Sequence, residues 1–171
     1  MIKRFIFFAA LISLVSSCRD GEPLYPDEPE IEYRGFSFFV SEDQLGNLTL
    51  TGRLSFDFTD GDGNLGLYPL PDDGGLSLPD TVKYNFFLQL YDYRDNEFVK
   101  VSRDDGGWLM YRIPYLDKEP LSGTIDLDIS YPIIVHDTIR YTFYIMDRDY
   151  HRSNTDTTET IILSNLDLEG S

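Results

Sequence analysis

Hydrophobic and polar residues alternate along most of the chain after Glu32. In the clearest run, Leu48 to Phe58, a Gly or an apolar residue occupies every second position, with Thr, Arg, Ser and Asp between. The same spacing recurs over 82–90, 125–129 and 139–145. Successive side chains of a β-strand point to opposite faces, so a period of two is typical of strands with one buried face. The chain is therefore expected to be all-β.

Clusters of glycine, proline and aspartate separate these runs and mark the expected turns. Pro69 to Asp80 contains three prolines and a Gly-Gly pair, which predicts a long surface connection. Asp104 to Gly107 predicts a hairpin turn before a strand that starts at Trp108. Shorter strands are expected over 36–40, 98–102, 108–113 and 158–163, which gives about seven or eight in all. This number favours a single antiparallel β-sandwich, with a closed barrel as the alternative.

The last two predicted strands resemble a known architecture. The strand 138–147, a loop and the strand 158–163 look like the final hairpin of immunoglobulin-like and fibronectin type III domains. That resemblance implies a sandwich fold and carries no function with it. A true antibody-type domain is not expected, because the Cys…Trp…Cys spacing is missing.

The N-terminus has the features of an export signal. Lys3 and Arg4 precede an apolar run from Phe5 to Val15, and small residues lead to Cys18, the only cysteine. This pattern predicts a signal peptide over 1–17, since the run is too short to span a membrane. Val-Ser-Ser-Cys also resembles the bacterial lipobox, in which the cysteine becomes the lipidated first residue of the mature protein. Cleavage elsewhere, leaving an unmodified cysteine, is the alternative.

An acidic, proline-rich stretch follows this cysteine. Residues 18–32 bear few apolar side chains, so we expect an extended tether there, followed by the β-sandwich domain over 33–171. Acidic residues behind a lipidated cysteine are similar to the signal that places Bacteroidota lipoproteins on the cell surface. We therefore expect an outer-membrane lipoprotein that faces outward, with a periplasm-facing lipoprotein as the alternative.

Charge restricts the possible partners. With 14 basic and 30 acidic residues, the chain carries a net charge of −16, which repels phosphate backbones and excludes nucleic-acid binding. The expected partners are the membrane, through the anchor at Cys18, and an unidentified protein or glycan.

The most distinctive local motif follows the second predicted strand. Asp60, Asp62 and Asn64 place oxygen donors at every second position, separated by glycines that let the backbone curl. Such donors suit Ca²⁺, which binds six to eight oxygens. The motif is not an EF-hand, because Leu65 occupies the glycine position and Pro71 the position of the closing glutamate.

A second loop can supply the missing ligands. In an immunoglobulin-like sandwich, the loop after the second strand and the loop before the last strand lie at the same end. Asp147 and Asp149 lie in the latter loop, so they are expected to join the first three donors in a structural calcium site. The alternative is that the motif only forms a turn and that Arg148 and Arg152 neutralise its acids.

These two motifs together resemble a protein family. Asp-Gly-Asp-Gly-Asn-Leu-Gly after a phenylalanine-rich strand, with a later Asp-x-x-x-x-x-Ser-Asn, is similar to small lipoproteins of Bacteroidota, from the leader through Asn154. The resemblance implies no particular activity.

Catalysis finds little support in the sequence. His136 and His151 are the only histidines, and neither accompanies a nucleophile motif. Asp126 and Asp128 form a possible carboxylate pair, but their spacing places both on the outer face of a strand. We therefore expect no enzymatic activity and no catalytic residues.

An aromatic face offers a binding role instead. Phe87, Tyr91 and Tyr93 share the outer face of one predicted strand, and Tyr144 lies on a second. If exposed, these rings could stack on sugars or receive a protein; the favoured alternative is that residues 98–113 fold over and bury them. The expected function is a non-enzymatic interaction or assembly module at the outer membrane, and the alternative is a carbohydrate-binding lipoprotein of a glycan-uptake system.

Overall fold

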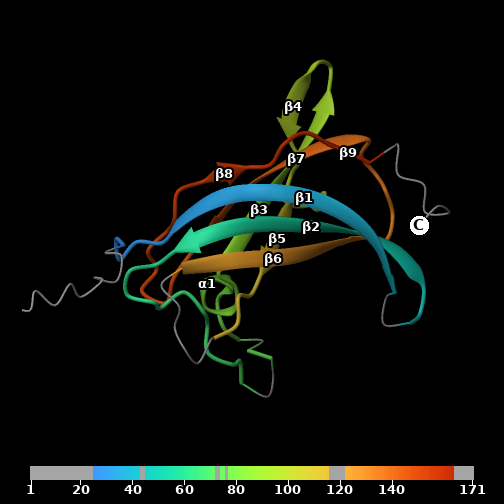
Figure 1. Cartoon of the computed structure of the whole chain (residues 1–171). Helices are drawn as coiled ribbons and strands as arrows, with labels where there is room; N and C mark the ends of the chain where they lie inside the picture. The colour runs from blue at the N-terminus through green and yellow to red at the C-terminus, as the bar shows by residue number, and fades with distance from the viewer. Residues whose placement is uncertain (1–24, 43–44, 72–73, 76, 116–121, 164–171) are drawn as a thin grey trace, which may run out of the picture.

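The computed structural model describes residues 25–42, 45–71, 74–75, 77–115 and 122–163 (Figure 1). The expected signal peptide and Cys18 lie outside these ranges. Within them, no helix has the length and apolar character needed to cross a membrane.

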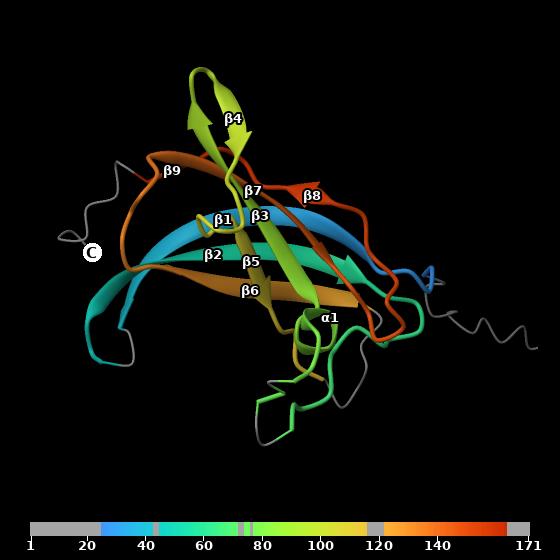
Figure 2. The same cartoon turned by 180° about the vertical axis from the view of Figure 1, so that it is seen from behind.

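Two antiparallel sheets pack face to face, as expected from the alternation. Figures 1 and 2 show the two layers, whose strands cross one another in projection. The first sheet has the order β1-β2-β6, formed by β1 (Glu30–Glu42), β2 (Leu48–Thr59) and β6 (Ser122–Tyr131). The second has the order β4-β3-β7-β8, and β5 and β9 extend it beside β3 and β7. Its strands are β3 (Phe86–Arg94), β4 (Glu97–Lys100), β5 (Trp108–Tyr111), β7 (Thr138–Ile145), β8 (Asp156–Thr157) and β9 (Ile161–Ile162).

Aromatic side chains fill the space between the sheets. Phe56 from β2, Phe86 from β3 and Phe143 from β7 are fully buried, with ring centroids 5.2 to 5.8 Å apart. Burial of each such side chain stabilises the fold by about 2 kcal/mol relative to exposure. Gly52 in β2 is part of this packing, because a Cβ there would lie 2.4 Å from the Phe36 ring. The alternating pattern thus places one large apolar face of each sheet in a common core.

The outer face of the first sheet is polar. Arg34 pairs with Asp57, Arg53 pairs with Asp128, and Asp126 accepts a hydrogen bond from Ser55. Asp126 and Asp128 are therefore engaged in cross-strand contacts on an exposed face. Such pairs contribute little to stability, since water screens them.

Some elements begin or end elsewhere than expected. The strand predicted from Val82 begins at Phe86, because Pro79 leads into a one-turn helix, α1 (Asp80–Lys83). β1 begins at Glu30, inside the segment expected to be tether. Of the strand predicted over 158–163, only β9 (Ile161–Ile162) forms, because the Thr158 side chain accepts the N–H of Tyr141. The short β8 (Asp156–Thr157) precedes the predicted segment, which brings the strands in the described residues to nine instead of seven or eight.

The hairpin turn predicted at Asp104 to Gly107 does not form. β4 and β5 both pair with β3 and not with each other, so this segment is a loop that turns back onto the sheet. The tight hairpin lies between β3 and β4, where Asp95 and Asn96 both have positive φ (53° and 67°). Two successive positive φ values are typical of the two-residue turns that match the twist of paired strands.

A buried pair of tyrosines makes the fold sensitive to alkaline pH. The hydroxyls of Tyr131 and Tyr141 lie 3.1 Å apart, and burial raises the pKa of Tyr141 to about 12 and also raises the pKa of Tyr131. Because the unfolded chain ionises its tyrosines near pH 10, the stability due to their neutral folded forms is complete below pH 10 and is lost as the pH rises above it. For Tyr141 this loss is about 1 kcal/mol at pH 11.

We predict that Tyr141→Phe makes the free energy of unfolding less dependent on pH, as measured by urea unfolding of the purified chain at pH 8 and pH 11. Tyr93→Phe, at an exposed hydroxyl, is the matched control. An identical drop in stability for the unchanged chain and Tyr141→Phe would contradict the prediction.

Candidate functional site

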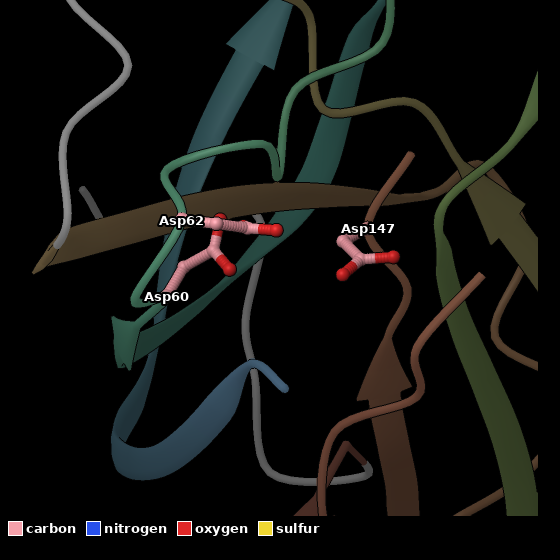
Figure 3. Close-up of side chains that lie close together, drawn as sticks. All are labelled: Asp60, Asp62 and Asp147. Atoms are coloured by element: carbon pink, nitrogen blue, oxygen red, sulfur yellow. The ribbon is translucent and has the colours of Figure 1, made fainter. Parts of the chain in front are cut away.

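Three of the predicted calcium ligands lie together at one end of the sandwich. Oxygen atoms of Asp60, Asp62 and Asp147 lie within 4.8 Å of one another. Asp60 follows β2 and Asp147 follows β7, so the loops of the two sheets meet here as the sequence predicted. Figure 3 shows Asp60 and Asp62 on one loop, with Asp147 facing them from the other. We refer to these three residues as the acidic cluster.

Asp60 is the most unusual member of the cluster. Its side chain is fully buried, and neither carboxylate oxygen has a hydrogen-bond partner among the described residues. Its burial, followed by the charges of Asp62 and Asp147, raises the pKa of Asp60 to about 7. The Leu65 backbone N–H lowers the pKa of Asp60, although its position does not meet the geometry of a hydrogen bond. An unpaired buried carboxylate is costly, so this position requires an explanation.

Asp147 is held in place by its own loop. Its Oδ1 accepts the backbone N–H of His151 at 2.8 Å, and its Oδ2 lies 2.9 Å from Nδ1 of the same imidazole. The hydrogen bond and charge of Asp147 raise the pKa of His151. His151 therefore orients a carboxylate toward the cluster, a role that its isolated position in the sequence did not indicate.

Asn64 and Asp149 adjoin the cluster. The Asn64 amide donates to Asp62 at 2.6 Å and to Asp149 at 3.1 Å, which links the two loops. Asp149 is thus connected to the cluster through Asn64. The two arginines of the alternative interpretation lie over aromatic rings: Arg148 over Tyr68 and Tyr115, and Arg152 over Tyr144 at 3.8 Å.

The start of the folded domain rests on the same loop. The backbone N–H of Gly61 donates to the carbonyl of Pro26 at 2.8 Å. A Cβ at position 61 would lie 2.3 Å from the carbonyl oxygen of Tyr25 and 2.5 Å from that of Pro26. Only glycine allows this close approach, so the segment that precedes β1 packs directly against the loop that carries the acidic cluster.

Asn154 forms a clamp that sequence reasoning did not find. Its side chain accepts the N–H of Ile31 at 2.8 Å and donates to the carbonyl of the same residue at 2.9 Å. Asp156 similarly accepts the N–H of Tyr33. These side chains take the place of a neighbouring strand and tie the edge of β1 to the second sheet. The Ser-Asn pair stood out in the motif, but its partner lies 123 residues away.

The predicted aromatic residues do not form one continuous platform. Phe87 is only 4% exposed and stacks against Tyr144, with centroids 5.0 Å apart. Tyr91 is half-buried, and Tyr93 lies near the β3–β4 hairpin against Phe98. The segment 98–113 was expected to fold over this face. Its strands β4 and β5 instead pair with the edge of β3 and widen the sheet.

The opposite end of the sandwich exposes apolar side chains that sequence reasoning missed. Ile133 and Val135, in the β6–β7 loop, are 76% and 77% exposed, and Leu48 at the start of β2 is 66% exposed. Tyr131 pairs with Leu50, so this loop starts beside Leu48. A pocket of about 200 Å³ includes Ile133 and Val135 of this loop in its lining, and its other lining residues are both apolar, such as Leu90, Leu109, Ile129, Ile139 and Leu163, and polar, such as Asp105, Ser130 and His136. We call Leu48 and Ile133 to Val135 the distal tip.

Comparisons of the chain with protein-family models, curated proteins and solved structures gave no match.

The Asn154 clamp yields a direct prediction. Asn154→Ala removes two hydrogen bonds to the β1 backbone and is expected to lower the free energy of unfolding by about 1 to 2 kcal/mol. Asn154→Asp keeps the acceptor but places a charged oxygen against the Ile31 carbonyl, so it should lower stability at least as much in urea unfolding at pH 7. Thr155→Ala, at the next exposed position, is the control. Equal stability of Asn154→Ala and this control would show that the clamp contributes nothing.

Proposed function

We propose that this chain is an outer-membrane lipoprotein of the Bacteroidota type, anchored through Cys18, that acts as a non-enzymatic interaction module. The observation that carries the interaction role is the exposed distal tip. The lipid anchor is inferred from the N-terminal sequence that leads to Cys18. The strand order, β1-β2-β6 against β4-β3-β7-β8, agrees with the immunoglobulin-like resemblance.

The positions of the two ends support this role. The chain enters the domain at Tyr25 and Pro26, beside the acidic cluster at the end of β2. The distal tip adjoins the start of β2, twelve residues or about 40 Å away. An anchor at the N-terminus therefore leaves the tip free to face away from the lipid, where a partner can reach it.

The composition of the tip indicates a protein partner. Single exposed apolar residues are common, but contiguous ones beside an apolar pocket mark interaction sites. The pocket is large enough for one apolar side chain, and the net charge of −16 favours a neutral or basic partner.

Both histidines lie beside carboxylates. His136 lies 3.3 Å from Asp92, and His151 lies 2.9 Å from Asp147. These pairs join loop residues to their neighbours.

Carbohydrate binding is the second candidate. Trp108 and Tyr144 are half-buried on the outer face of the second sheet, where the Phe87 ring packs against both. Partly exposed aromatic rings with a neighbouring arginine, here Arg152, suit the stacking and hydrogen bonding of a sugar.

We predict that the double variant Ile133→Asp with Val135→Asp loses its partner without losing its fold. A photo-crosslinker at Leu48 in the full chain, in its native membrane, should capture one protein, and the double variant should reduce capture by about tenfold or more. The physical reason is that charged side chains at the tip oppose burial against an apolar partner.

Tyr68→Ser, at an exposed site near the acidic cluster, is the matched control and should retain capture. Cys18→Ser should release the chain from the membrane fraction if Cys18 is the anchor. Unchanged capture by the double variant would contradict the proposal, and glycan binding that Trp108→Ala abolishes would favour the second candidate.

A further inference from the structure

The acidic cluster brings oxygen donors from two loops together. If the Asp60 loop were only a turn, the aspartate side chain would bond to its own backbone. Instead, the Asp60 backbone carbonyl accepts the N–H of Gly63, and both side-chain oxygens are buried without a partner. The geometry thus leaves a buried carboxyl group without a partner beside two further carboxylates.

The spacing of these oxygens suits a cation. Ca²⁺ binds oxygens at 2.3 to 2.6 Å, so two ligands on opposite sides of the ion lie about 4.6 to 5.2 Å apart. The three carboxylates offer atoms within 4.8 Å of one another. An ion at their centre lies at most about 2.8 Å from each of the three atoms, so shifts of a few tenths of an ångström bring all three residues within bonding distance.

The type of donor identifies the class of ion. All the groups of the cluster are carboxylates, and the adjacent Asn64 offers an amide oxygen that receives only a long contact, 3.4 Å, from the Arg148 N–H. Hard oxygen donors select Ca²⁺ or Mg²⁺ over zinc and copper, which prefer nitrogen and sulfur. Three carboxylates from two loops favour Ca²⁺, since Mg²⁺ keeps most of its water and demands a strict octahedron.

We propose that Asp60, Asp62 and Asp147 bind one Ca²⁺ ion and that this ion fixes the joint between the tether and the sandwich. The joint is the hydrogen bond from the backbone N–H of Gly61 to the carbonyl of Pro26. Gly61 directly follows Asp60 in the sequence. Neutralising the cluster removes the repulsion between the β2 and β7 loops, so the surface against which Pro26 packs becomes rigid. This inference is independent of the partner proposed for the distal tip.

The first test is binding by the purified full chain. Isothermal titration should detect one Ca²⁺ per chain, with a dissociation constant between about 10⁻⁶ and 10⁻³ M. A hundredfold excess over that constant should raise the Tm by about 5 to 10 °C relative to EDTA. No heat and no change in Tm would overturn the proposal, and an equal response to Mg²⁺ would overturn the assignment to calcium.

Asp60→Asn separates metal binding from simple stabilisation. This variant removes the buried charge and keeps the shape, so it should melt at a higher temperature than the unchanged chain in EDTA and lose the response to Ca²⁺. Asp62→Asn is the second variant if the first fails to fold. Asp126→Asn, on the outer face of the first sheet, is the matched control. A full Ca²⁺ response in both cluster variants would overturn the site.

The joint has its own measurement. Hydrogen exchange of the Gly61 amide should slow by about tenfold or more when Ca²⁺ replaces EDTA. The Val101 amide, which donates to Leu90 in the second sheet, is the internal control. Ca²⁺ binding with unchanged Gly61 exchange would overturn the role at the joint.

Discussion

The buried carboxylate of Asp60 is the constraint on which one end of this protein depends. It lies where β2 leaves the first sheet, in contact range of the loop that follows β7 in the second sheet. The segment that enters β1 rests on the adjacent Gly61, and the Asn154 clamp joins the same loop region to β1. A charge without a partner at this junction would push the loops apart, whereas a cation would hold them together.

The two ends of the sandwich have opposite chemistry. One end is acidic and adjoins the entry of the chain, and the other exposes the apolar distal tip. Between them, Phe56, Phe86 and Phe143 form an aromatic core that must stabilise the domain without disulfides, since the chain has one cysteine. This polarity suits a module that is fixed at one end and makes contacts at the other.

Local sequence patterns predicted the fold well. The features that were missed depend on contacts between residues far apart in the sequence. The alternation over 48–58 predicted β2 to within a residue, and the oxygen spacing together with the sandwich topology brought Asp60, Asp62 and Asp147 together. The error at Val82 arose because Pro79 starts a helical turn that overrides alternation. The role of Asn154 depends on a strand edge far away in sequence. Exposure of Ile133 could not be predicted, because an apolar run alone does not distinguish a surface loop from a buried strand.

The most direct test of this account is a crystal structure of the full chain grown with CaCl₂, with anomalous data to identify the ion. The account predicts one calcium among the carboxylates of Asp60, Asp62 and Asp147, with metal–oxygen distances of about 2.3 to 2.6 Å. A well-ordered cluster in which Asp60 is hydrogen-bonded to protein or water, with no anomalous peak beside it, would contradict the central claim.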